Sequence, residues 1–260
     1  MIPICKETRA EILRISKESG HGHLPTCFSV IEILYAVYNS IRHDPKNPAW
    51  YERDIFILSK GHAALAHYCV LAKLGYFNIK EVYTFGAYMT DFGCHADRLK
   101  VIGSEVSAGS LGHGIGIATG VALAFKIKNN KRRVITLIGD GESNEGSVWE
   151  AVMVSVNLKL DNLTIIYDNN MSHTRGLQIL NPDERFKAFG CDVIVVDGHD
   201  VDSLQKAIKS GSNKVKTIVA NTEKGFGCRT LVENQYEWHR KSPNEAEFAK
   251  LIAELDEKAV

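Results

Sequence analysis

Apolar runs and amphipathic stretches alternate regularly along the second half of the chain. Four short runs are rich in Val, Ile and Leu, as buried strands are. They cover residues 133–139, 163–168, 192–197 and 216–222. Stretches with helical periodicity separate them, at residues 147–160, 183–189 and 202–210. Strands that alternate with helices predict an α/β fold, a doubly wound and mostly parallel sheet with helices on both faces.

The first half is predicted to be mainly helical, and single residues mark two helix ends. Ser29 is followed three residues later by Glu32, a capping-box pattern that predicts a helix beginning at Ser29. Gly75 can end an Ala-rich helix in the left-handed conformation. The other predicted elements are helices at 6–19 and 244–259, a strand at 54–59, and a helix that the glycine-rich segment 109–120 opens.

Composition and charge exclude several classes of protein. The 260 residues contain 31 Lys and Arg against 31 Asp and Glu, and this zero net charge argues against a nucleic-acid or membrane-surface binder. No apolar run is long enough to cross a bilayer, and the N-terminus shows no secretory signal. We therefore expect a cytoplasmic protein. No repeat or linker is visible, so residues 1–260 are expected to form one domain without an internal boundary.

The six cysteines indicate neither a disulfide framework nor a zinc site. They are scattered along the chain, and no two have the spacing of metal ligands. We expect reduced, mostly buried thiols. They are Cys5, Cys27, Cys69, Cys94, Cys191 and Cys228.

Polar residues follow two neighbouring predicted strands. Gly139 and Gly141 flank Asp140, and glycines let a backbone approach a phosphate while a helix beginning near Gly146 presents its positive end. An aspartate repels a bare phosphate, but it suits a divalent cation that bridges carboxylate and phosphate oxygens. Asn170 follows the next strand and could reach the same ion. Taken alone, each pattern also occurs in ordinary turns and loops.

Gly-Asp-Gly, followed about thirty residues later by Asn-Asn, resembles the thiamine-diphosphate motif. Further segments resemble transketolases in the order in which that family has them. They are GHLPTCFSVIEIL (22–34), LSKGHA (58–63), GCHADR (93–98), VSAGSLGHGIGIATGVALA (106–124), GDGESNEGSVWEA (139–151), YDNNMS (167–172) and ENQYEWHRK (233–241). The chain thus resembles the N-terminal, pyrophosphate-binding half of a transketolase, produced as a separate polypeptide.

This resemblance implies thiamine diphosphate and Mg²⁺ as cofactors. The side chains of Asp140 and Asn170 and the carbonyl of Ser172 would hold the metal, and Gly141 would hydrogen-bond the diphosphate. Other cofactor-site residues are implied by their places in the matched segments. They are Gly109 and Leu111 on the aminopyrimidine side, His62 at the diphosphate, and Glu145, which would join the two active sites across a dimer interface.

Four of the ten histidines stand on the matched segments. Imidazole titrates near neutrality and both donates and accepts hydrogen bonds, which suits ketol transfer between sugars. By resemblance, His23 and His239 handle the proton transfers and His95 binds the C1 hydroxyl of the donor. The remaining histidines without a matched segment are expected to be structural. They are His43, His67, His173 and His199.

Two positions leave alternatives. His21 lies two residues before His23 and could take its place in the family motif, although the nine-residue distance from His23 to Glu32 fits the family better. Arg240 stands where the family has a glycine after His239, and Arg240 or Lys241 could favour an anionic sugar.

The implied activity is transfer of a two-carbon ketol unit from a ketose, phosphorylated or otherwise anionic, to an aldose. In this family the glutamate that activates the cofactor belongs to a pyrimidine-binding domain, which these 260 residues do not include. We therefore expect a C-terminal partner subunit, in a two-plus-two heterotetramer. The alternatives are a catalytically silent homologue that binds thiamine diphosphate, the α subunit of a 2-oxo-acid dehydrogenase, and a half-length 1-deoxyxylulose-phosphate synthase.

Overall fold

The computed structural model describes residues 1–173 and 176–257, and its strands form a five-stranded sheet. The strand order is β1-β2-β3-β5-β4, and every neighbouring pair is parallel. The strands are β1 (Ile55–Leu58), β2 (Val134–Gly139), β3 (Leu163–Asn169), β4 (Asp192–Asp197) and β5 (Lys216–Asn221). The predicted parallel α/β fold is confirmed, and each predicted strand lies within about a residue of its expected bounds.

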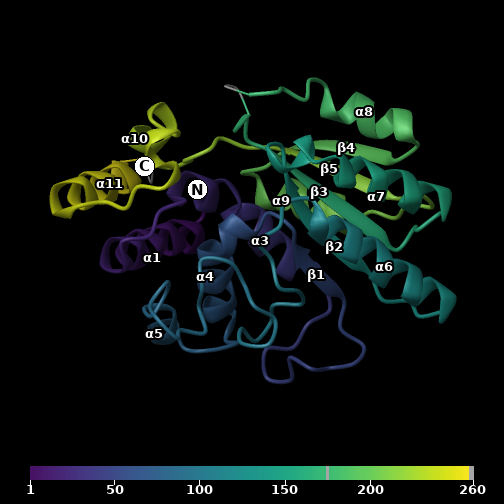
Figure 1. Ribbon diagram of the computed structural model, residues 1–260, viewed down its shortest axis with the longest axis horizontal. Helices are drawn as coiled ribbons and strands as arrows, with labels where there is room; N and C mark the ends of the chain where they lie inside the picture. The colour runs from purple at the N-terminus through teal and green to yellow at the C-terminus, as the bar shows by residue number, and fades with distance from the viewer. Residues whose placement is uncertain (174–175, 258–260) are drawn as a thin grey trace.

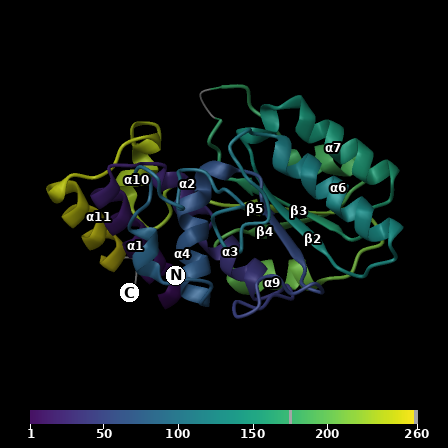
Figure 2. The ribbon, with the colours of Figure 1, turned by 60° about the horizontal axis from the view of Figure 1, so that its bottom comes forward.

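Helices cover both faces of the sheet (Figures 1 and 2). One face packs against α3 (Ile31–Tyr38) and α9 (Val201–Lys209), and the other against α6 (His113–Ile127), α7 (Gly146–Asn157) and α8 (Pro182–Phe189). Alternate residues of β1 show the division, because Phe56 and Leu58 join the first core while Ile55 and Ile57 join the second. This alternation is the period of two that a strand imposes on its side chains.

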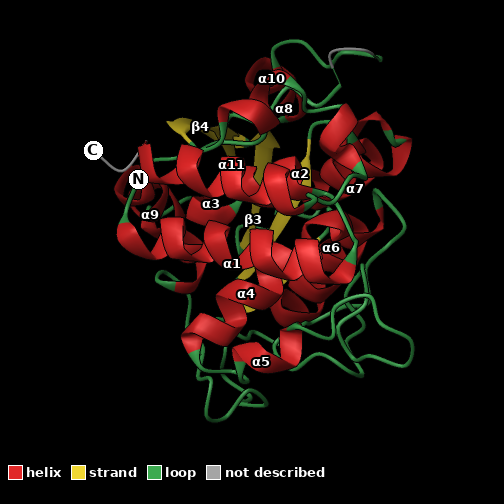
Figure 3. Ribbon diagram, turned by 90° about the vertical axis from the view of Figure 1, so that its left-hand side faces the viewer, coloured by secondary structure: helices red, strands yellow, loops and turns green. Residues whose placement is uncertain are grey.

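A second group of helices extends the first core away from the sheet. Figure 3, in which the left-hand side of Figure 1 faces the viewer, shows α1 and α11 in front of the strands. This group comprises α1 (Pro3–Ser19), α2 (Leu24–Ser29), α4 (Ala64–Leu74), α5 (Ile79–Val82), α10 (Arg229–Glu233) and α11 (Glu245–Glu257). Three short 3₁₀ segments cover Gly61–Ala63, Glu142–Asn144 and Glu237–His239. The last two residues of the helix expected at 244–259 lie outside the described residues.

The capping-box prediction at Ser29 is wrong. Ser29 is the last residue of α2, and α3 begins at Ile31. The Ser29 hydroxyl donates to the carbonyl of Thr26 and to Oδ2 of Asp168, at 3.0 and 2.8 Å. Glu32 instead accepts two hydrogen bonds from Arg9. Both side chains are recruited by tertiary partners, which a local sequence pattern does not reveal.

The prediction for Gly75 is confirmed. Gly75 ends α4 with a φ of 93°, in the left-handed conformation. All six cysteines are free thiols, and only Cys94 is partly exposed. None of the helices within 1–173 and 176–257 combines the length and apolar character of a membrane span.

Candidate active site

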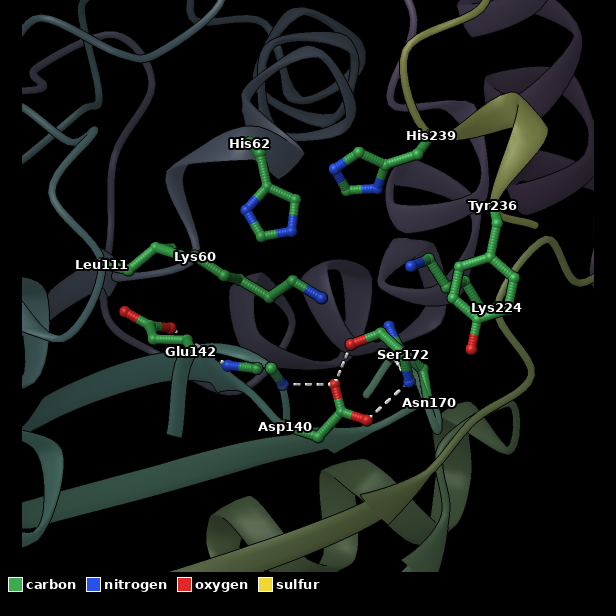
Figure 4. A pocket seen from close by; sticks show the side chains of 12 residues that line it. Lys60, His62, Leu111, Asp140, Glu142, Asn170, Ser172, Lys224, Tyr236 and His239 are labelled. Atoms are coloured by element: carbon green, nitrogen blue, oxygen red, sulfur yellow. Dashed lines mark hydrogen bonds between the residues drawn. The ribbon is translucent and has the colours of Figure 1, made fainter. Parts of the chain in front are cut away.

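The carboxyl ends of β2, β3 and β5 open onto a cavity of about 450 Å³ (Figure 4). Parallel sheets place their ligand sites at this edge. In Figure 4 the rings of His62 and His239 lie across the cavity from Asp140 and Ser172. The lining residues are Lys60, His62, Leu111, Gly139, Asp140, Gly141, Glu142, Asn170, Ser172, Lys224, Tyr236 and His239.

The three proposed metal ligands meet at the ends of β2 and β3. Asp140 and Asn170 are only 1% and 3% exposed. The carboxylate of Asp140 accepts hydrogen bonds from the amides of Gly141 and Ser172, at 2.6 and 2.7 Å, and from the Ser172 hydroxyl. The Ser172 amide also donates to Oδ1 of Asn170 at 3.1 Å. Adjacent parallel strands therefore bring together residues that lie about thirty positions apart.

This oxygen-rich group fits Mg²⁺. A carboxylate, an amide oxygen and a main-chain carbonyl are hard ligands, and a ligand's phosphate oxygens and water would complete a six-coordinate shell. No three His, Cys, Asp or Glu side chains come together as a metal site in the described ranges. One carboxylate alone would bind Mg²⁺ weakly, so the cluster suits a metal that arrives with a phosphate ligand.

His173 is a neighbour of this group that the sequence did not indicate. Its Nδ1 lies 2.7 Å from Oδ2 of Asp140, and the side chain is buried. Because the Gly141 amide donates to Oδ1, His173 and Gly141 approach different oxygens of the same carboxylate. No motif sets His173 apart from a structural histidine, so only the fold reveals this contact.

Two buried lysines bring positive charge to the cavity wall. Lys60 follows β1 and forms an ion pair with Asp168, and Lys224 follows β5. Burial, reinforced by the charge of Lys60, lowers the pKa of Lys224 to about 8. Ammonium groups at the ends of two strands suit the oxygens of a diphosphate. Each lysine precedes a glycine and stands one or two residues after a predicted strand, which is the signal that could have identified them.

A buried carboxylate organises the floor of the cavity. Asp168 is fully buried and accepts hydrogen bonds from Ser29, at 2.8 Å, and from the Asn170 amide, at 3.0 Å. Lys60 and the Thr222 hydroxyl donate to it as well. These donors satisfy the charge of Asp168, and they fix the Asn170 side chain so that its oxygen is directed away from Asp168.

Glu142 forms a second buried junction beneath the cavity. Its carboxylate accepts from the Ser59 hydroxyl at 2.6 Å and from the amides of Gly112 and Gly139 at 2.9 and 3.1 Å. Burial raises the pKa of Glu142, against the effect of these three donors. The contacts tie β1 and β2 to the start of α6, so they hold the Gly139–Gly141 turn in place.

Three of the four sequence-selected histidines form a cluster above the metal-ligand group. The ring centroid of His23 lies 5.1 Å from that of His239 and 5.9 Å from that of His62. Burial, together with the nearby His239 and His95, lowers the pKa of His23 to about 4. Burial also lowers the pKa of His62 and His239. All three rings are therefore neutral at pH 7, and each offers one donor and one acceptor nitrogen.

His95 and His21 are outside this cluster of three rings, although His95 is near enough to His23 to help lower its pKa. His95 is exposed and packs against Gly61, where an added Cβ would come within 3.1 Å of its Cδ2. His21 lies beside Cys94 and Gly86, with ring nitrogens 3.6 Å from the thiol sulfur and 3.4 Å from the carbonyl oxygen. It is His23 that lies in the cluster with His62 and His239.

The remaining selected residues divide between the cavity and its rim. Leu111 and Gly141 line the cavity. Gly109 is outside the lining and lies beside His95, with a φ of 144°. Glu145 is also outside it, exposed at the start of α7. Two histidines expected to be structural bond to tyrosine hydroxyls: His43 to Tyr76 at 2.9 Å and His67 to Tyr38 at 2.7 Å.

Known proteins resemble this chain over nearly its whole length. Residues 4–256 match the family model described as transketolase, thiamine diphosphate binding domain. An apulose-4-phosphate transketolase subunit of Actinobacillus succinogenes is 36% identical over 259 residues, covering 96% of this chain and 94% of that protein. The 6-deoxy-6-sulfo-D-fructose transketolase subunit SqwG of a Clostridium species is 36% identical over 246 residues, covering 91% and 89%.

A solved structure shares the fold. The transketolase of Campylobacter jejuni superimposes with a TM-score of 0.89 at 28% identity, covering 98% of this chain. The match spans 43% of that transketolase, so this chain corresponds to less than half of it.

Proposed function

Since the chain belongs to the transketolase family, as its thiamine-diphosphate-binding domain, we propose that it is the pyrophosphate-binding subunit of a two-subunit transketolase. One observation carries the proposal: the Asp140, Asn170 and Ser172 cluster and two buried lysines face a group of neutral histidines across one cavity. A catalytically silent homologue would not need the histidines. A 2-oxo-acid dehydrogenase α subunit lacks those of LSKGHA and GCHADR.

The family cofactor is thiamine diphosphate with Mg²⁺. Asp140, Asn170 and the carbonyl of Ser172 would hold the metal, while Lys60, Lys224 and His62 would attract the diphosphate, as would the amide of Gly141. Gly109 and Leu111 would lie on the aminopyrimidine side. When bound, the cofactor supplies the nucleophilic carbon and the electron sink for carbon–carbon cleavage.

The histidines of this chain would move the protons. His23 and His239 are neutral at pH 7, so either can take the proton of the donor's C3 hydroxyl and return it to the acceptor's carbonyl oxygen. His95, exposed beside Gly61, would bind the C1 hydroxyl of the donor. These groups bind and orient the sugar and provide the acid–base steps.

A partner subunit would complete the site. The two relatives described above are named as transketolase subunits. The partner would supply the glutamate that activates the cofactor, in a two-plus-two heterotetramer. Exposed apolar side chains on α6 and α7, among them Ile117, Met153 and Val154, support a covered surface beside the exposed Glu145. Residues 1–260 would form one domain of this cytoplasmic enzyme.

The substrates would be anionic sugars. The relatives are named for apulose 4-phosphate and 6-deoxy-6-sulfo-D-fructose, a phosphate and a sulfonate. Arg240 is exposed directly beside the histidine cluster, and its charge contributes to the lowered pKa values of His23 and His239. Lys241 is held by Glu237 and Glu247 at 2.8 and 2.6 Å. Of the two cations, Arg240 would be the one to receive a sugar anion, because Lys241 already pairs with two carboxylates.

Reconstitution tests the proposal. The chain would be assayed for ketol transfer with thiamine diphosphate and Mg²⁺, alone and with the pyrimidine-binding subunit, on phosphorylated and sulfonated ketoses. We expect transfer only from the pair. Comparable turnover by the chain alone would contradict the need for a partner, and no transfer by the assembled pair with any ketose would contradict the activity.

A further inference from the structure

Lys224 enters the cavity from a segment whose backbone is fixed on both sides. The amide of Thr222 donates to the carbonyl of Asn169 at 3.2 Å, and the amide of Gly225 donates to the carbonyl of Pro25 at 3.0 Å. Lys224 itself is 5% exposed, and its ammonium belongs to the cavity wall. The position of that ammonium therefore depends on the backbone that carries it.

The residue before Lys224 is held by a histidine from a different strand end. The amide of Glu223 donates to Nε2 of His199 at 2.9 Å. Because an amide only donates, Nε2 must be the unprotonated acceptor, and the ring proton must be on Nδ1. Nδ1 lies 3.1 Å from Oε2 of Glu32, a carboxylate that accepts it. The two contacts select one tautomer of His199.

The His199 ring is itself immobilised by a buried ion pair and an aromatic stack. Glu32 is 1% exposed and receives two hydrogen bonds from Arg9, at 2.6 and 2.7 Å. The ring of Phe226 stacks on His199 with centroids 3.6 Å apart, and the Arg9 guanidinium lies 5.2 Å from the Phe226 centroid. A rigid assembly of α1, α3 and the turn after β4 thus reaches the backbone beside Lys224.

We propose that His199 is a positioning residue for cofactor binding, which holds the Glu223 amide so that Lys224 stays directed into the diphosphate pocket. The inference rests on the proposed function, in which Lys224 contacts the diphosphate. It separates His199 from His43 and His67, whose tyrosine partners do not line the cavity.

Two substitutions of His199 each keep one of its two hydrogen bonds and remove the other. In His199→Gln the side-chain oxygen can take the place of Nε2 and accept from Glu223. In His199→Asn the shorter amide can take the place of Nδ1 and donate to Glu32, but the acceptor for Glu223 is lost. Thiamine diphosphate with Mg²⁺ would be titrated calorimetrically into the complex of the chain with its partner subunit, for these variants, Lys224→Met and His199→Asn/Lys224→Met.

We expect Lys224→Met to raise the Kd about ten-fold, the size of a lost charged hydrogen bond, and His199→Asn to raise it by most of that factor. His199→Asn should have no further effect in the Lys224→Met background, because the residue acts through Lys224. His199→Gln should bind as wild type does. This last result tests the proposal even if His199→Asn does not fold.

Three results would overturn the inference. The first is a wild-type Kd for His199→Asn. The second is an equal factor of increase in Kd when His199→Asn is made in the wild type and in Lys224→Met. The third is a His199→Gln variant that folds but binds as weakly as Lys224→Met. In each of these the wild type still binds the cofactor, so the proposed function stands. Absence of cofactor binding by the wild-type complex would instead overturn the proposed function and this inference together.

Discussion

The main-chain amide of His23 donates a 3.0 Å hydrogen bond to the carbonyl of His239, which joins the N-terminal helices to the 3₁₀ turn near the other end of the chain. Their rings lie 5.1 Å apart, edge to face. His23 adopts a φ of 67°, uncommon for a side chain with a Cβ. The backbone contact therefore holds the ring pair in one geometry, which suits two groups that exchange protons with one sugar.

Gly22 makes the close contact between the His23 and His239 backbones possible. A Cβ at this position would lie 2.4 Å from the carbonyl carbon of Arg240, so Gly22→Ala must separate the two segments. We expect kcat/KM for ketol transfer to fall about 100-fold, as displacing catalytic groups by about an ångström does. Cofactor affinity should change little. Gly211→Ala, where an added Cβ meets nothing within 4 Å, is the control. Equal activity of the two variants would contradict a role for the His23–His239 backbone contact.

Substitution of histidines tests which imidazole is catalytic. His23→Ala removes a group that faces His62 and His239, so kcat/KM should fall about 10² to 10⁴-fold. His21→Ala removes contacts to Cys94 and Gly86 and should cost much less. Steady-state kinetics of the complex measures both. A His21→Ala variant as impaired as His23→Ala would reverse the assignment.

The lowered pKa of Lys224 predicts how cofactor affinity depends on pH. Burial lowers its pKa from 10.5 to about 8, so the ammonium loses its charge as pH rises through about 8 in the free site. The diphosphate favours the charged form. Affinity should therefore be steady near pH 7 and decline above pH 8, when measured by calorimetry from pH 6.5 to 9. Lys224→Met should flatten this decline, and an unchanged pH profile in that variant would exclude Lys224 as its source.

The buried ion pair of Arg9 and Glu32 is expected to contribute strongly to the stability of the fold. Burial opposes ionisation of Glu32, but hydrogen bonds from Arg9 outweigh it and lower the pKa to about 2. Because this folded-state pKa is depressed, the pair stabilises the fold above about pH 4.5 and loses its effect as pH falls towards 2.

Arg9→Met leaves Glu32 buried without its charged partner, with only the contact to His199, so the free energy of unfolding at pH 7 should fall by about 3 to 5 kcal/mol in urea denaturation. Arg14→Met, which removes the exposed partner of Glu11, is the matched control and should cost under about 1 kcal/mol. If the two variants lost equal stability, the buried pair would have no special role.

Periodicity predicted the sheet and most helices, because those elements bury regular apolar positions. Local chemistry was less informative where tertiary contacts intervene. Ser29 and Glu32 read as a helix cap, but Asp168 and Arg9 bind them instead. These tertiary contacts replace the local cap between α2 and α3, and they involve residues far apart in the sequence.

The candidate site was predictable where a residue type follows a strand end. Asp140 and Asn170 were selected for that reason, and the structure brings them together. Lys60, Lys224 and Glu142 were missed because charged side chains are normally exposed. Their burial depends on partners from distant segments, such as the contact of Ser59 with Glu142.

Calorimetric titration of Mg²⁺ and thiamine diphosphate into the chain with its partner subunit tests the central claim most directly. The wild type and the control Asp183→Ala, which removes an ion pair with Lys187 outside the cavity lining, should bind equally and only when Mg²⁺ is present. Asp140→Ala should raise the Kd by at least about 100-fold, since even residues behind a metal ligand cost 10 to 100-fold. An Asp140→Ala variant with wild-type affinity, or wild-type binding that does not depend on Mg²⁺, would contradict the account.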